Sequence, residues 1–168
     1  MAGESSIRYN KKLAFRTARP VADAALLIRF GRDLYKESVG REDAFYRDYG
    51  RYGASFPLWI ANCLSRDPSF AALLTEDGRE IGLIVIGMDE RDETLGRVHQ
   101  LYVTPSHRGQ GFGGLLDDYA RDILSALGAR RARLNVAVGN ARAIRFYKAL
   151  GWEEMTRRGG LLWLETRL

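Results

Sequence analysis

The spacing of apolar and polar positions changes several times along the chain, and each change predicts a new element. Leu13 and Phe15 alternate with polar residues, which is typical of a strand. The Asp77-Gly78 pair lies between two apolar runs and is a strong signal for a two-residue hairpin turn. In order, the pattern predicts a strand within 11–18, helices within 21–35 and 56–65, and strands at 70–75, 81–88 and 97–103. The charged, tyrosine-rich stretch 40–53 has no clear period.

A different rhythm begins after Val103, where a glycine-rich loop at 104–114 precedes an amphipathic segment. The elements predicted there are a helix within 115–127, a strand at 133–138, a helix from Asn140 to Gly151, and a hairpin of 152–156 and 161–166. A strand, a helix and a strand in succession predict one β-α-β crossover. We therefore expect a single α/β (α+β) domain over 1–168, with a mixed sheet of about seven strands flanked by about four helices. Residues 1–10 are expected to be a flexible tail.

Composition excludes several classes of protein. The chain is 46% hydrophobic, which is too apolar for a disordered protein, and no apolar run approaches the roughly 20 residues of a membrane span. Its single cysteine, Cys63, has no partner for an intrachain disulfide and is expected to be a packed residue. The polar segment Met1–Lys12 has no apolar core of a secretory signal, so a cytoplasmic location is expected.

Positive charge is concentrated in the second half of the chain. Residues 94–168 hold 12 Lys and Arg against 6 Asp and Glu, whereas residues 1–93 hold 14 against 15. A basic half-domain favours anionic ligands such as nucleotides and phosphates. An equally good reading is that an arginine-rich composition, with 22 Arg and 4 Lys, produces basic surfaces in general. Nucleic acid is not expected as a partner, because no basic motif with interleaved aromatic residues is present.

The segment Arg108–Gly114 places four glycines between a predicted strand and a predicted helix. Amides in the first turn of a helix have no internal acceptor, and glycine lets a phosphate approach them. The segment is therefore a candidate pyrophosphate cradle, with a simple tight turn as the alternative. Gly109-x-Gly111-x-x-Gly114 also matches the dinucleotide fingerprint of a Rossmann fold, but it comes late in the chain, and arginines stand where that fingerprint needs an acidic residue. No Lys-Ser/Thr follows the glycines, which excludes a P-loop.

Two ordered motifs resemble the GNAT superfamily of N-acetyltransferases. The acetyl-coenzyme A motif of that family resembles Leu101-Tyr102-Val103-x-Pro105 followed by Arg108-x-x-Gly111-x-Gly113. The family's second signature is similar to Asn140-x-x-Ala143-Ile144-x-Phe146-Tyr147-x-x-Leu150-Gly151-Trp152. The resemblance covers the chain from about Phe15 to its end. It implies the GNAT fold with a β-α-β acetyl-CoA-binding core, in which two parallel strands splay apart around the coenzyme.

The resemblance also assigns roles to residues. The pantetheine arm of acetyl-CoA is expected to lie along the main chain of Leu101, Tyr102 and Val103. The residues expected to hold the pyrophosphate through the loop are Arg108, Gly109, Gln110, Gly111, Phe112, Gly113 and Gly114. Asn140 is expected to bond the arm, although a plain helix cap is an equally good reading. Tyr147 is implied as the general acid that protonates the leaving sulfur, and no metal is expected.

The general base is where the sequence departs from the family. Many members place a carboxylate early in the fourth strand or on the fifth, but Arg97-Val98-His99-Gln100 and Leu134-Asn135-Val136 contain none. His99 is the candidate base, acting directly or through water, against the alternative of a surface or hydrogen-bonded structural histidine. Asn135 is a candidate to position a water. His107, beside the loop, is expected to contact a coenzyme A phosphate or solvent.

The expected reaction is acetyl transfer from acetyl-CoA to a primary amine of a small molecule or peptide, by direct attack in a ternary complex. The missing carboxylate also motivates a second hypothesis, a coenzyme A-binding regulatory module without turnover. No membrane partner is expected, and a homodimer is left open.

Segment 35–59 is rich in aromatic and acidic side chains, and it is predicted to select a cationic amine. The alternative is that its aromatic rings pack short helices against the sheet. Its members are Tyr35, Glu37, Glu42, Asp43, Phe45, Tyr46, Asp48, Tyr49, Tyr52, Phe56 and Trp59.

Overall fold

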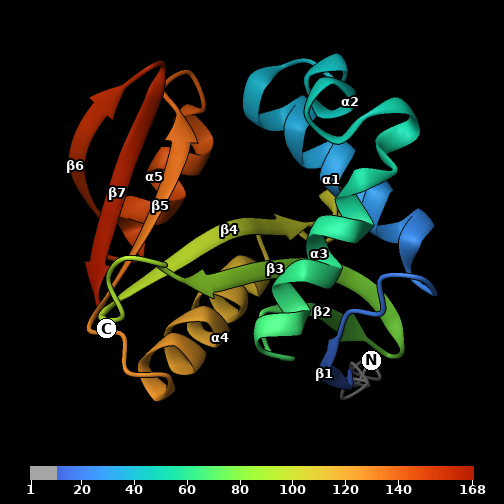
Figure 1. Cartoon of the computed structure of the whole chain (residues 1–168), viewed down its shortest axis with the longest axis horizontal. Helices are drawn as coiled ribbons and strands as arrows, with labels where there is room; N and C mark the ends of the chain where they lie inside the picture. Colours follow the sequence, from blue (N-terminus) through green and yellow to red (C-terminus); the bar gives the residue numbers. More distant parts are fainter. Residues whose placement is uncertain (1–10) are drawn as a thin grey trace, which may run out of the picture.

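An open sheet of seven strands organises the chain in the computed structural model, which describes residues 11–168 (Figure 1). The predicted tail at 1–10 lies outside the described residues. The strands are β1 (Leu13–Thr17), β2 (Ala71–Glu76), β3 (Arg79–Met88), β4 (Leu95–Val103), β5 (Arg131–Ala137), β6 (Glu153–Arg158) and β7 (Leu161–Arg167). Their order across the sheet is β1-β2-β3-β4-β5-β7-β6, in which β4 and β5 are parallel and every other neighbouring pair is antiparallel. The predicted mixed sheet and its β-α-β crossover are confirmed.

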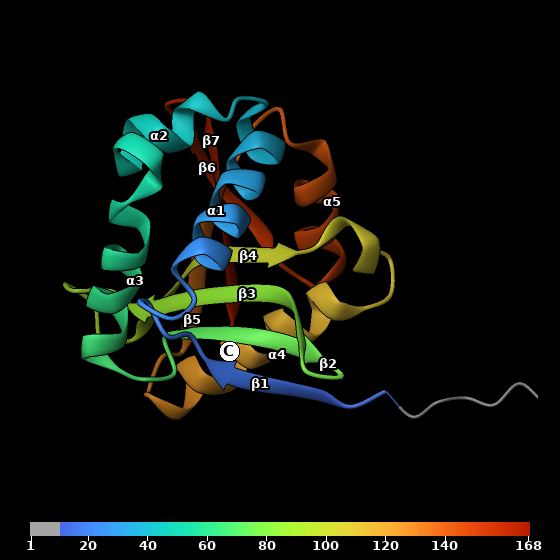
Figure 2. The ribbon, with the colours of Figure 1, turned by 90° about the vertical axis from the view of Figure 1, so that its right-hand side faces the viewer.

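Helices cover both faces of the sheet. They are α1 (Ala24–Val39), α2 (Asp43–Tyr49), α3 (Ser55–Arg66), α4 (Phe112–Ala126) and α5 (Ala141–Ala149). Figures 1 and 2 show α1 and α3 on one face and α4 on the other. Gly96 of β4 is needed on the α4 face, because a Cβ there would come within 2.6 Å of the Leu124 side chain. None of the helices in the described range 11–168 is long and apolar enough to cross a membrane.

The structure adds one helix to the predicted set and lengthens another. The stretch without a clear period, 40–53, contains α2, whose Ala44 and Phe45 are buried, and a 3₁₀ turn at Arg51–Gly53. Helix α4 begins at Phe112 rather than at Leu115, because Gly111 adopts a left-handed conformation (φ 88°) at the N-cap and the next two glycines form the first turn. Part of the predicted loop is therefore helix.

The β4–β5 pair sets the position of the site. Only Leu95–Arg97 of β4 is in register with Arg131–Arg133 of β5, and beyond these residues the two strands diverge. On its other side β4 remains paired with β3 as far as Val103. The second half of β4 therefore presents one unpaired edge toward β5.

A buried polar contact fixes α4 against the last hairpin. The carboxylate of Asp117, 2% exposed, accepts a hydrogen bond of 2.9 Å from the indole nitrogen of Trp152 and one of 2.6 Å from Nε of Arg121. Arg121 in turn donates to the carbonyl oxygen of Leu150 at 3.0 Å. A buried carboxylate is tolerated when it is paired in this way, and the contact holds α4 at a fixed distance from the end of α5.

Candidate functional site

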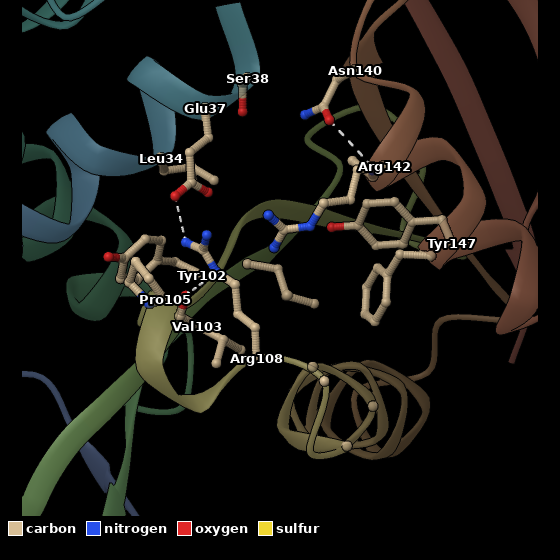
Figure 3. A pocket seen from close by; sticks show the side chains of 17 residues that line it. Leu34, Glu37, Ser38, Tyr102, Val103, Pro105, Arg108, Asn140, Arg142 and Tyr147 are labelled. Carbon is tan, nitrogen blue, oxygen red and sulfur yellow. Dashed lines mark hydrogen bonds and ion pairs between the residues drawn. The ribbon is translucent and has the colours of Figure 1, made fainter. Parts of the chain in front are cut away.

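A cavity of about 890 Å³ lies where β4 and β5 diverge. Its walls come from the C-terminal end of α1, the end of β4, the glycine-rich loop with the first turn of α4, and α5 (Figure 3). These segments are far apart in sequence and meet at this point of the fold. A cavity of this size is typical of sites for small ligands and cofactors.

The glycine-rich loop forms the anion-binding end of the cavity. Gly109 and Gly111 both line it and have positive φ angles of 70° and 88°, a conformation that other residues rarely adopt. The first bond of α4 runs from the amide of Leu115 to the carbonyl of Gly111 at 3.2 Å. The preceding amides of the first turn therefore have no acceptor within the helix, and they lie at the positive end of its dipole.

The two glycines of the first turn of α4 differ in their surroundings. A Cβ at Gly113 would come within 2.8 Å of the Phe146 ring, so this glycine allows α4 and α5 to pack closely. A Cβ at Gly114 would meet nothing within 4 Å, and Gly114 lines the cavity. Both glycines line the cavity; Gly114 leaves open space for a ligand, whereas Gly113 also allows the close packing of α4 on α5.

Two arginines supply positive charge to this cavity. The Nε atom of Arg108 donates to the carbonyl oxygen of Val103 at 2.9 Å, and its Nη2 atom forms an ion pair with Glu37 of α1. Arg142 of α5 also lines the cavity, and Figure 3 shows its guanidinium pointing into it. The sequence analysis missed Arg142, and it assigned Glu37 to the acceptor segment 35–59, whereas the structure places Glu37 on this cavity in a pair with Arg108. Arg142 lies within the segment already singled out, two residues after Asn140, and its charge was the available signal.

The unpaired edge of β4 contributes main-chain groups. The carbonyl oxygen of Val103 accepts a hydrogen bond from Arg108 on the side of β4 away from β3. Main-chain groups two residues apart on a strand point to the same side, so the N–H and C=O of Leu101 also point away from β3. Leu101, Tyr102 and Val103 all line the cavity. The Tyr102 ring itself packs on Phe30 of α1, with ring centroids 4.8 Å apart, and burial raises the pKa of its hydroxyl to about 12. Tyr102 therefore shapes the wall rather than titrating.

Helix α5 brings Asn140 and Tyr147 to the cavity. The Oδ1 atom of Asn140 accepts a hydrogen bond of 3.2 Å from the amide of Ala143, so Asn140 caps α5, and its side-chain nitrogen remains a donor for another partner. Tyr147 is 7% exposed and packs against Phe146 and Trp152 at centroid distances of 5.0 and 5.7 Å. Burial, and after it the nearby Asp117 carboxylate, raise the pKa of Tyr147. Its hydroxyl is therefore protonated at neutral pH and able to donate a proton.

His99 lies outside this cavity, at an irregularity of β4. Val98 is opposite Ile86 and Gln100 is opposite Val85, so His99 is the extra residue of a β-bulge. The imidazole ring of His99 packs edge-on against the ring of Trp59, with 5.8 Å between the ring centroids. The His99 side chain is exposed, as the surface alternative predicts, and partial desolvation by the atoms around it, followed by the positive charges of Arg97 and Arg66, lowers its pKa below the usual value. A neutral imidazole at physiological pH is the form that a general base requires.

Several other predicted residues are not part of the cavity wall. The Gln110 side chain turns back to donate to the carbonyl of Ser106 at 3.2 Å, and Phe112 is buried with its ring 6.1 Å from that of His107. Neither side chain lines the cavity, so their main-chain atoms are the groups nearest to the predicted pyrophosphate contact. The His107 ring is hydrogen-bonded to Thr104 at 2.8 Å. Cys63 is buried, and burial raises the pKa of its thiol.

The aromatic segment 35–59 is mostly packing. Phe45 and Phe56 are fully buried, and the rings around them form a chain of contacts with centroid distances of 4.9 to 6.2 Å. The acids predicted to attract a cation are already paired: Glu42 with Lys36, Asp43 with Arg41, and Asp48 with Arg47. These contacts favour the packing interpretation over selection of a cationic amine by this segment.

Comparison with known proteins identifies relatives of the whole arrangement. The sequence profile of the acetyltransferase (GNAT) family matches residues 32–152. An uncharacterised N-acetyltransferase of Methanocaldococcus jannaschii is 27% identical over 128 residues, which are 73% of this chain and 54% of that protein. The chain thus spans about half the length of that relative. An uncharacterised N-acetyltransferase of Archaeoglobus fulgidus is 32% identical over 123 residues, which are 68% of this chain and 78% of that protein.

A solved structure extends the likeness to the fold. The PaiA N-acetyltransferase of Thermoplasma acidophilum, determined in complex with coenzyme A, superposes with a TM-score of 0.77. The alignment covers 94% of this chain and 99% of that one at 19% identity. At this identity the match establishes a shared fold.

Proposed function

The chain belongs to the acetyltransferase (GNAT) family, and we propose that it moves the acetyl group of acetyl-CoA to a primary amine of a small molecule or peptide. The observation that carries the proposal is the cavity at the divergence of β4 and β5, which joins an anion-binding loop to a buried tyrosine. The coenzyme A bound in the PaiA structure supports the choice of donor.

The residues present fit acetyl-CoA. The unpaired amides at the start of α4, the open space at Gly114 and the Arg142 guanidinium suit its phosphates. The free edge of β4 at Leu101 and Val103 suits the amides of its pantetheine arm. Asn140 supplies a further donor at the same wall.

The proposed reaction is direct attack of the amine on the thioester carbonyl. A bond forms between the amine nitrogen and the carbonyl carbon, and the carbon–sulfur bond breaks. His99 accepts the amine proton, directly or through water, and Tyr147 donates a proton to the departing sulfur. Main-chain amides on the free edge of β4 near Leu101 and Val103 polarise the carbonyl, as preorganised donors do in other acyl transfers.

The direct test is release of free thiol from acetyl-CoA in the presence of a panel of primary amines. We expect amine-dependent thiol release, with formation of the N-acetyl product confirmed by mass spectrometry. Binding of acetyl-CoA without amine-dependent release by any member of a broad panel would contradict the proposal and favour a binding module without turnover.

Acetyl-CoA is also expected to stabilise the protein, whereas NAD(H) is not. A ligand that binds only the native state at about 100 times its Kd adds about 2.7 kcal/mol. For a chain of this size the corresponding rise in Tm is about 5–10 °C. Differential scanning fluorimetry measures both ligands side by side. A rise in Tm with NAD(H) and none with acetyl-CoA would contradict the proposal and favour the interpretation of the glycine loop as a dinucleotide-binding fingerprint.

The substitution Gly114→Val tests the cradle. A Cβ at this position has no other atom within 4 Å, Gly114 lines the cavity, and valine is a better helix former than glycine. We expect the KM for acetyl-CoA to rise about tenfold or more, which is the cost of one lost hydrogen bond to a charged group. The Tm should be unchanged or slightly higher, and Gly114→Ala should have a smaller effect on KM. An unchanged KM for acetyl-CoA in the valine variant would remove Gly114 from the coenzyme site.

A further inference from the structure

A second cavity, of about 460 Å³, is lined by Arg97 and His99 of β4, whereas the first is lined by Leu101–Val103 at the C-terminal end of the same strand. We call it the α3 cavity. It is enclosed by Trp59, Asn62, Cys63 and Arg66 of α3, by Phe70, by residues 86–91 at the end of β3 and its turn, and by Arg97 and His99 of β4. Phe70 and Ile86 are buried and supply an apolar base, and charged side chains surround it. Neither the family resemblance nor the coenzyme site accounts for this cavity.

The two cavities adjoin along β4. Leu101 lines the coenzyme cavity and His99, two residues earlier, lines the α3 cavity. Two residues of a strand span about 7 Å. Under the function proposed above, the acetyl carbonyl lies near His99, so a molecule in the α3 cavity is within reach of the reacting centre.

The charges of the α3 cavity do not cancel. Arg66 pairs with Glu90 at 2.6 Å, and Arg97 pairs with Asp89 at 2.6 Å. The main-chain amide of Arg91 donates to Oδ1 of Asp89 at 3.0 Å. The guanidinium of Arg91, in contrast, pairs with no carboxylate within the described residues 11–168. Three guanidinium groups and two carboxylates leave one uncompensated positive charge.

Arg97 retains unused donors as well. Its Nε and Nη2 atoms both donate to a single oxygen of Asp89, at 2.9 and 2.6 Å. A guanidinium has five N–H donors, so these bonds leave others for a ligand. The ring of Trp163 lies 5.7 Å from the Arg97 guanidinium carbon and helps to fix its orientation.

We propose that the α3 cavity binds the carboxylate of the acceptor, between Arg91 and Arg97, so that the substrate is an amino acid or a similar amine with a nearby carboxylate. The inference deepens the proposed acetyl transfer and rests on it. One excess positive charge matches the single negative charge of a carboxylate better than the two of a phosphate monoester. The arginine charges that lower the pKa of His99 would also repel an acceptor that carries only positive charge. A carboxylate on the acceptor offsets this repulsion.

Matched pairs of acceptors test the proposal. Glycine, β-alanine and 4-aminobutyrate are each compared with their own amide, which has nearly the same shape but no negative charge, and kcat/KM for thiol release is measured. The readout is the acid-to-amide ratio of kcat/KM, compared between wild type and variants, because the intrinsic reactivity of each amine cancels in that comparison. The three acids differ in the distance between amine and carboxylate. We include all three because the distance between His99 and Arg91 determines which of them fits.

Two variants of exposed residues shift this ratio in opposite directions. Arg91→Gln is expected to lower the acid-to-amide ratio about tenfold or more, as for loss of a charged hydrogen bond, and Arg91→Lys to restore most of it. Glu90→Gln frees Arg66 and is expected to raise the ratio. The Tm of each variant, with and without acetyl-CoA, verifies folding and coenzyme binding.

The outcomes separate the inference from the proposed function. Acetylation of amines with no preference for the acids, or a ratio that Arg91→Gln and Glu90→Gln leave unchanged, would overturn the carboxylate site while the acetyltransferase proposal stands. An absence of thiol release with every amine, despite a rise in Tm with acetyl-CoA, would overturn the proposed function and the inference together. A preference for the acids that falls in Arg91→Gln and rises in Glu90→Gln supports the assignment.

Discussion

Replacement of Tyr147 by phenylalanine is expected to lower kcat about 100-fold while the KM for acetyl-CoA changes little. The ring is buried against Phe146 and Trp152, and phenylalanine preserves those contacts. The variant therefore loses only the hydroxyl, the proton donor proposed for the leaving sulfur, and general acid catalysis contributes about 10²–10⁴-fold in enzymes. Steady-state kinetics with acetyl-CoA and a saturating amine measures both constants.

Tyr119 offers a matched control for this substitution. Its hydroxyl donates to the carbonyl of Ser69 at 2.9 Å, Tyr119 lines neither cavity, and burial raises its pKa as it does for Tyr147. Tyr119→Phe is expected to lower the stability by about 1 kcal/mol, because it leaves a carbonyl without its donor, and to preserve kcat. Equal kcat values for the two variants would make Tyr147 a packing residue.

The pH dependence of kcat provides a second check on Tyr147. Burial and the Asp117 carboxylate raise the pKa of its hydroxyl above the ordinary value for tyrosine, about 10. The donor form therefore persists through the alkaline range in which an exposed tyrosine ionises. We expect no alkaline fall of kcat from this group up to pH of about 10, measured with buffers that span pH 7–10.

Hydrophobic spacing was sufficient to predict most elements of the sheet. Runs such as β3 are bounded by clear turn signals, and Asp77 and Gly78 adopt the positive φ angles, 49° and 80°, that the hairpin turn requires. Helix α2 escaped prediction because seven residues contain too few apolar positions to reveal a period. The start of α4 escaped because glycine favours loops, whereas packing on Phe146 makes Gly113 helical here.

The candidate site was predictable where its residues share a motif and not where tertiary structure assembles it. Gly109, Gly111 and Asn140 lie in the two motifs, and the structure places all three on one cavity. The ion pair between Arg108 and Glu37 joins residues 71 positions apart, and no local pattern announces it. The α3 cavity likewise combines residues of α3 with residues of the turn before β4. Its charge balance could therefore not be predicted before the fold was known.

The divergence of β4 from β5 leaves one short stretch of strand lining two cavities. From Leu95 to Arg97 the strand has partners on both sides, and beyond Arg97 its edge toward β5 is free. The bulge at His99 lies at this transition. Under the two proposals, a donor on the free edge and an acceptor beside Arg97 would meet near His99, which makes His99 the most informative position at which to test the base.

The substitution His99→Gln is expected to lower kcat about 100-fold at pH 7.5 and to change the pH dependence. The pKa of His99 lies below 6.5, so the neutral form predominates at neutral pH and is lost as the pH falls through that lowered pKa. The advantage of wild type over the variant should therefore be constant above pH of about 7 and shrink toward one in acid. The ratio of the two kcat values removes the ionisation of the amine itself, which is common to both proteins.

His107→Gln is the matched control, because it removes the other histidine of the chain and leaves β4 unchanged. His107 is bonded to Thr104 and lies 3.4 Å from Glu76, outside the walls of both cavities. The ratio of wild-type kcat to that of His107→Gln should not vary with pH through the acidic range. If the same flat ratio were found for His99→Gln, the amine proton would leave through water or Asn135, and the bulge would position the main chain alone.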